Sequence, residues 1–300
     1  MRLGVSNLLW TRDLDEPVAD LLNRRGIDAI DLVPTRYVGD VAATTTADLR
    51  AIRRFWSGRG IDIVGMQSLL HATSGLNVFG DADARRRTAE HLRAVLRFGA
   101  EVGAAQMVFG SWRNRMRGAL DTDAALDSAA DFFAEVAQVA ARLGVCLTIE
   151  PIGARYGNDF LVDHGEAARL VERVGHPSFR LTLDLGCIRL AGEDVATVVR
   201  RHGHLVSHVQ LAEYELALLD AGNPLHAVAG EVLTKFLAGR VACIEALKPP
   251  ELSAVDAIAQ CLDVAQPHYG RSSPAPGATG APPETAIPSS TERSMPAKTR

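Results

Sequence analysis

The sequence predicts an α/β fold, a (β/α)8 TIM barrel, because short apolar segments alternate eight times with longer amphipathic stretches. Such alternation indicates a parallel sheet, and eight repeats favour closure into a barrel over an open doubly wound sheet with the same local pattern. The expected strands cover residues 3–9, 27–33, 61–67, 105–110, 145–150, 179–184, 206–211 and 240–246.

Two of the intervening stretches, 82–103 and 124–143, show the helical pattern clearly. Their apolar residues recur every three or four positions among charged ones, which places them on one face of a helix. Several helical stretches end in a glycine directly before the next strand, where a left-handed backbone conformation is typical. These glycines are Gly26, Gly60, Gly103 and Gly144.

Composition divides the chain into a barrel and a tail. A hydrophobic fraction of 47% is enough for a large core, and 300 residues accommodate one barrel of about 250 residues. Seven of the 14 prolines follow residue 266, in a segment of mostly small and polar residues that cannot bury enough apolar surface to fold. We expect a TIM barrel over residues 1–268 and a disordered Pro/Ser/Ala-rich tail over residues 269–300.

Charge and hydropathy restrict the partners and the location. A net charge of −4 argues against nucleic acid, whose binders usually carry a basic face. No stretch reaches the length of about 18 uncharged apolar residues that a membrane span needs, and no signal peptide is evident. The four cysteines include no CxxC pair, so they indicate reduced thiols. We expect a cytoplasmic protein without a membrane or nucleic-acid partner.

Four oxygen-bearing side chains close four successive expected strands: Glu150, Asp184, Gln210 and Glu245. In a TIM barrel, the active site lies at this end of the strands. A single strand-end carboxylate is usually solvated or salt-bridged. Four oxygen-bearing side chains on consecutive strands, three of them carboxylates, instead predict an oxygen-rich pocket for a divalent metal, because buried carboxylates are unfavourable without a balancing cation.

Several segments together resemble the xylose-isomerase-like superfamily, in the branch of sugar phosphate isomerases and epimerases. The resemblance covers residues 3–266 and rests on VSNLLW (5–10), IDLVPTR (30–36), MQSLL (66–70), VFGSWRNRMRG (108–118), IEP with YGNDF (149–160), LDLG with GED (183–194), HVQLAE (208–213) and CIEAL (243–247). The set is specific, whereas any one segment alone is weak.

The resemblance implies a metal-dependent isomerase or epimerase of a small sugar or sugar derivative, which includes phosphorylated and acidic sugars. Glu150 and Glu245 would be the acid/base pair of an enediolate mechanism, and with Asp184 they would bind the metal. The family has a histidine ligand where this chain has Gln210, so we expect a harder metal, Mn²⁺ or Mg²⁺, ahead of Co²⁺ or Zn²⁺. Cys187 also replaces a substrate-binding histidine of tagatose-type epimerases.

Other residues near the expected strand ends are candidates for substrate contact. Plain structural roles, such as a solvated loop or a hydrogen-bonded core histidine, remain as alternatives for each. The candidates are Gln67, Asn114, Arg115, Tyr156, His208 and Glu213.

Three further interpretations follow from the resemblance. One is a dehydratase on the same scaffold, and another is a metal-depleted, non-catalytic sugar-binding homologue. Phosphodiester hydrolysis is disfavoured, because the positions for its histidine zinc ligands hold Gln67, Ser111, Cys187 and Gln210. By analogy with other barrels of the superfamily, a homodimer is the expected assembly.

Overall fold

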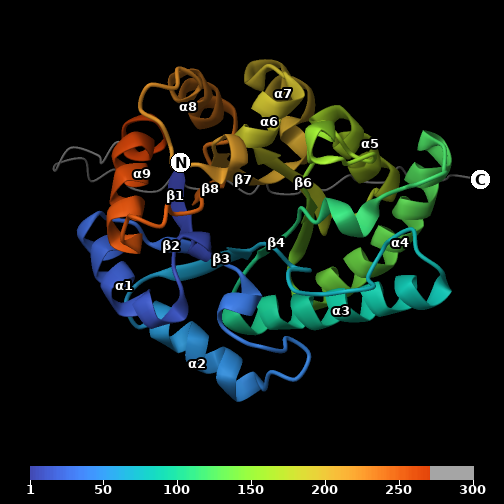
Figure 1. Ribbon diagram of the computed structural model, residues 1–300, viewed down its shortest axis with the longest axis horizontal. Coiled ribbons are helices and arrows are strands. Elements are labelled where there is room, and N and C mark those ends of the chain that lie inside the picture. Colours follow the sequence, from blue (N-terminus) through green and yellow to red (C-terminus); the bar gives the residue numbers. More distant parts are fainter. Residues whose placement is uncertain (271–300) are drawn as a thin grey trace, which may run out of the picture.

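Eight parallel strands close into a barrel in the order of the sequence, with helices around the outside (Figure 1). The computed structural model describes residues 1–270, and the prediction of a (β/α)8 TIM barrel is confirmed. The last strand closes the barrel on the first. The strands are β1 (Arg2–Ser6), β2 (Ala29–Leu32), β3 (Asp62–Met66), β4 (Gln106–Phe109), β5 (Cys146–Ile149), β6 (Phe179–Asp184), β7 (Val206–Ala212) and β8 (Val241–Glu245).

The helices lie between successive strands and cover the outer face of the barrel (Figure 1). They are α1 (Asp15–Arg24), α2 (Thr46–Ser57), α3 (Ala82–Val102), α4 (Thr122–Leu143), α5 (His164–Val174), α6 (Leu185–Ala191), α7 (Val195–His202), α8 (Leu225–Phe236) and α9 (Ala254–Tyr269). The side chain of Tyr269 is fully buried, so the folded part extends one residue past the expected boundary at 268. Of the predicted tail over residues 269–300, residues 271–300 lie outside the described part of the chain.

Helix α4 shows how local sequence signals fix an element and its packing. The Asp121 carboxylate accepts a hydrogen bond from the Ala124 N–H at 2.8 Å, which begins the helix, and Gly144 ends it at φ 70°. Its buried face includes Phe133, whose ring contacts Phe109 of β4 and stacks on Phe179 of β6 at centroid distances of 5.4 and 5.0 Å. These contacts hold α4 against the strands that carry the site.

The first strand is shorter than predicted. An apolar run suggested residues 3–9, but β1 ends at Ser6 and a 3₁₀ turn follows over Asn7–Leu9. The Ser6 hydroxyl accepts a hydrogen bond from the Leu8 N–H at 3.2 Å, and Asn7 Oδ1 accepts one from the Val33 N–H at 2.6 Å. These two side-chain acceptors turn the backbone out of the sheet.

Side chains two residues apart form successive polar layers inside the barrel, as the strand alternation predicts. One buried layer includes Thr148 and Thr182, which are joined by a hydroxyl hydrogen bond of 2.6 Å. Two residues further along each strand lie Glu150 and Asp184, and Asp184 is paired in register with Gln210 of β7. The polar strand ends therefore gather at one end of the barrel.

Candidate functional site

A pocket of about 720 Å³ opens at the carboxyl ends of the strands. Three of the four predicted strand-end residues line it: Glu150 after β5, Asp184 at the end of β6 and Glu245 at the end of β8. All three are buried, with 8%, 2% and 8% of their surface exposed, respectively. Gly110 provides the space that the Glu150 carboxylate occupies, since an added Cβ there would overlap Oε2.

These carboxylates have no ion-pair partner in the described part of the chain, although the charge of the buried Arg115 acts on Glu150. Among residues 1–270, none of the three forms an ion pair with a lysine, arginine or histidine. Burial, together with repulsion from Asp184, raises the pKa of Glu150 to about 8. Burial also raises the pKa of Asp184, and that of Glu245 lies well above its usual range. The pocket therefore gathers three carboxyl groups whose charged forms are disfavoured as long as no cation is bound.

Cys187, within α6, contacts two of the carboxylates. Its backbone N–H donates to Asp184 Oδ1 at 2.6 Å, and its thiol donates to Glu150 Oε1 at 3.7 Å. Asp184 Oδ2 is buried and has no hydrogen-bond partner. Ligand atoms of Glu150, Asp184 and Cys187 all lie within 4.8 Å of one another, so one cation fits between them.

Glu245 is held by two amides. Gln67 Nε2 donates to its Oε1 at 2.5 Å and Gln210 Nε2 donates to its Oε2 at 2.7 Å. Gln210 is fully buried and does not line the pocket, and its Oε1 has no hydrogen-bond partner. The amide predicted as a metal ligand thus presents its nitrogen to Glu245, while its oxygen remains free. The two amides fix the orientation of the Glu245 carboxylate.

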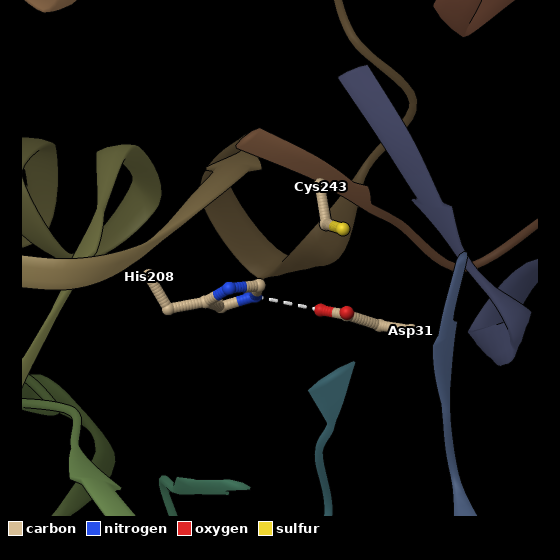
Figure 2. A group of neighbouring side chains, drawn as sticks. All are labelled: Asp31, His208 and Cys243. Atoms are coloured by element: carbon tan, nitrogen blue, oxygen red, sulfur yellow. Dashed lines mark hydrogen bonds and ion pairs between the residues drawn. The ribbon is translucent and has the colours of Figure 1, made fainter. Parts of the chain in front are cut away.

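His208 lies one layer deeper and does not line the pocket. Figure 2 shows its ring directed at Asp31 of β2, with Cys243 of β8 above them. His208 Nε2 and Asp31 Oδ2 are 2.7 Å apart, and both side chains are fully buried. Of the two roles open to His208, the structure places it as a hydrogen-bonded histidine inside the barrel rather than in contact with a ligand. Asp31, the penultimate residue of β2, was not among the predicted site residues.

Arg115, predicted to contact the substrate, is fully buried and does not line the pocket. Its guanidinium donates to the carbonyl oxygens of Phe109 and Glu150 at 3.2 and 2.7 Å. Burial lowers its pKa to about 10. Arg115 therefore fixes the ends of β4 and β5. The arginine that does line the pocket is the neighbouring Arg113, which lies 4.4 Å from the ring of Trp112.

The remaining predicted contacts, Asn114, Tyr156, Gln67 and Glu213, all line the pocket. The Asn114 side chain donates to the Leu76 carbonyl at 2.8 Å. Tyr156 is 37% exposed, so its ring is accessible at the entrance. Glu213 is paired with Arg189 and hydrogen-bonded to Asn223 and His226, so it differs from the unpaired carboxylates.

The xylose isomerase-like TIM barrel family model matches residues 19–262, most of the chain. The chain belongs to this family. No curated protein matches it in sequence. Within residues 1–270, no helix is long and apolar enough to cross a membrane.

Solved structures with the same fold include several sugar epimerases. D-psicose 3-epimerase from Clostridium cellulolyticum H10, with D-tagatose, is 16% identical at a TM-score of 0.75, covering 90% of this chain and 99% of that one. The 3-keto-D-glucoside 4-epimerase of E. coli is 15% identical at 0.72, covering 87% and 98%. An L-ribulose 3-epimerase is 17% identical at 0.69, covering 89% and 91%. These identities establish the shared fold alone.

Proposed function

We propose that this family member is an isomerase or epimerase of a small sugar or sugar derivative, assisted by a divalent cation. The observation that carries the proposal is the group of three buried carboxylates, Glu150, Asp184 and Glu245, which line one pocket and form no ion pair among residues 1–270. Such a group is unfavourable in an empty protein, and a bound cation relieves its mutual repulsion.

The residues present fit a divalent cation. Asp184 Oδ2 and Gln210 Oε1 are buried acceptors without hydrogen-bond partners, and the Glu150 carboxylate receives only the weak thiol donor of Cys187. Glu150, Asp184 and Glu245 would hold the ion, whereas Gln210, which the sequence predicts as the fourth ligand, donates its Nε2 to Glu245 and does not line the pocket. When bound, the cation supplies the positive charge that stabilises a developing enediolate.

Glu150 and Glu245 provide proton transfer on the two sides of the pocket. They follow β5 and β8, which are not neighbours in the barrel, and both line the same space. The pKa of Glu150, raised to about 8, suits a carboxyl group that takes up and returns a proton near neutral pH, and burial raises the pKa of Glu245 in the same direction. Removal from one face of a carbon and return to the other gives an epimer, whereas return to the adjacent carbon gives an aldose–ketose pair.

The pocket also suits a polyhydroxylated substrate. Amide, hydroxyl and carboxyl groups line it, and its volume of about 720 Å³ exceeds the need of a single monosaccharide. Arg113 offers a charge for a phosphorylated or acidic sugar. The structural relatives that are named as epimerases of D-psicose, L-ribulose and a 3-keto-glucoside agree with this substrate class. Homodimer formation and a cytoplasmic location remain predictions.

Proton exchange tests the proposal directly. A panel of ketopentoses and ketohexoses is incubated with the protein and a divalent cation in deuterated water, and NMR follows deuterium at the carbon next to the carbonyl. We expect incorporation that falls by about 10²–10⁴-fold in Glu150→Gln or in Glu245→Gln. The exposed Glu251→Gln serves as control. Exchange that persists in either pocket variant would remove that glutamate from the acid/base pair.

A further inference from the structure

Cys187 is the one thiol that lines the carboxylate pocket within residues 1–270. It is 7% exposed, and its sulfur faces Glu150 Oε1 at 3.7 Å. From the resemblance we expected no role for Cys187 beyond replacing a substrate-binding histidine of tagatose-type epimerases. The structure gives it two neighbours that are themselves candidate cation ligands.

The second observation is the state of Asp184. This side chain lines the pocket, is 2% exposed, and keeps Oδ2 without any hydrogen-bond partner, while Oδ1 accepts from the Cys187 N–H at 2.6 Å. The backbone of Cys187 thus orients the carboxylate, and one Asp184 carboxylate oxygen lies within 4.8 Å of the sulfur and of a Glu150 oxygen. Three potential ligand atoms from three side chains therefore meet at one point.

The spacing matches a tetrahedral metal site. With zinc–sulfur and zinc–oxygen bonds of about 2.3 and 2.1 Å, neighbouring sulfur and oxygen ligands lie about 3.6 Å apart. The sulfur of Cys187 and Oε1 of Glu150 are separated by 3.7 Å. Gln210 presents its nitrogen to Glu245, so the amide orients Glu245 from outside the pocket.

We propose, on the basis of the proposed function, that Cys187 is a sulfur ligand of the cation together with Glu150 and Asp184. The thiol proton passes to solvent as the cation binds. A sulfur ligand changes the expected metal, because thiolate favours Zn²⁺ or Co²⁺ over Mg²⁺ and Mn²⁺. The missing imidazole at position 210 is then compensated from α6, and Gln210 orients Glu245.

Cobalt absorption tests this ligand directly. The full-length protein is treated with a chelator and titrated with Co²⁺, while binding is followed by calorimetry and the near-ultraviolet sulfur-to-cobalt charge-transfer band by absorption. Cys187→Ser keeps the backbone N–H that orients Asp184. Cys243→Ser is the matched control, since that buried thiol lies beside Asp31 and His208 in the second cluster (Figure 2).

We expect the band in the natural protein and in Cys243→Ser, and its loss in Cys187→Ser. Loss of a residue that only hydrogen-bonds to a metal ligand lowers metal affinity by about 10–100-fold. The affinity of Cys187→Ser for Co²⁺ should fall by more than this. Binding of Co²⁺ without the band, or a band lost only in Cys243→Ser, overturns the proposal but leaves the cation site standing. Absence of any Co²⁺ binding overturns the proposed function as well.

A second measurement covers the case in which Cys187→Ser does not fold. X-ray absorption of the natural protein loaded with Zn²⁺ should show one sulfur at about 2.3 Å from the metal. A shell of oxygen and nitrogen alone would overturn the proposal.

Discussion

Replacing Glu150 by glutamine should stabilise the cation-free protein. The side chain is 8% exposed, and no lysine, arginine or histidine within residues 1–270 forms an ion pair with it. Its charged form is therefore disfavoured in the folded state, and glutamine keeps the shape while removing the charge. A carboxylate that served mainly the fold would show the opposite response.

The pKa of Glu150 gives the magnitude. Burial and the nearby Asp184 raise it from 4.5 in a free chain to about 8 in the fold. A group with a raised folded-state pKa adds stability below its unfolded value and loses it as the pH rises through the folded value. At neutral pH the loss is on the order of 3 kcal/mol. Relaxation around the site reduces this, so we expect Glu150→Gln to raise Tm by about 5–10 °C.

Thermal unfolding of the chelator-treated protein at neutral pH, followed by circular dichroism, measures the effect. Glu213→Gln is the matched control, because this buried glutamate is paired with Arg189 and accepts hydrogen bonds from Asn223 and His226. We expect that control to lower the free energy of unfolding by about 1–3 kcal/mol. A lower Tm in Glu150→Gln as well would refute the inference that the pocket carboxylates are uncompensated.

Three other predictions follow from the same contacts. Glu150 alone should cost the cation-free protein up to about 1.4 kcal/mol of stability per pH unit as the pH rises from 4.5 to about 8. Saturating Co²⁺ should flatten the slope in urea denaturation, and a stability that rises with pH over this range would contradict the raised pKa. Gln67 and Gln210 orient the Glu245 carboxylate, so Gln67→Ala or Gln210→Ala should slow proton exchange by about 10–100-fold and change cation affinity little. Unchanged exchange would show that Glu245 needs no orienting amide. Arg115→Met should lower the free energy of unfolding by about 1–3 kcal/mol, because Arg115 donates to two backbone carbonyls. Arg113→Met should raise KM and leave Tm unchanged, because Arg113 lines the pocket. The reverse pattern would mean that Arg113 supports the fold and Arg115 contacts the substrate.

The fold could be predicted because each signal in it is local. Alternation of apolar segments, helix faces and the glycines that end helices all act within a few residues, and Gly26, Gly60, Gly103 and Gly144 do adopt positive φ. The predicted end of β1 was wrong, because Asn7 accepts a hydrogen bond from Val33, a residue distant in sequence. No local pattern reveals that contact.

The site was predictable only as far as strand alternation determines it. The rule placed Glu150, Asp184 and Glu245 at one pocket. It gave no information on how side chains bend after leaving the backbone, so it did not predict that Arg115 is buried or that Arg113, which was not among the predicted residues, lines the pocket. Nor does it report hydrogen bonds between distant strands, such as the amides on Glu245 or the pair of His208 with Asp31.

Calorimetric titration of the chelator-treated, full-length protein with Zn²⁺ and with Mn²⁺ tests the central claim most directly. If the buried carboxylates form a cation site, one ion should bind per chain, Asp184→Asn should abolish binding, and the exposed Glu251→Gln should leave it unchanged. A natural protein that binds neither ion, or an Asp184→Asn variant that binds as well as the natural protein, would contradict the account.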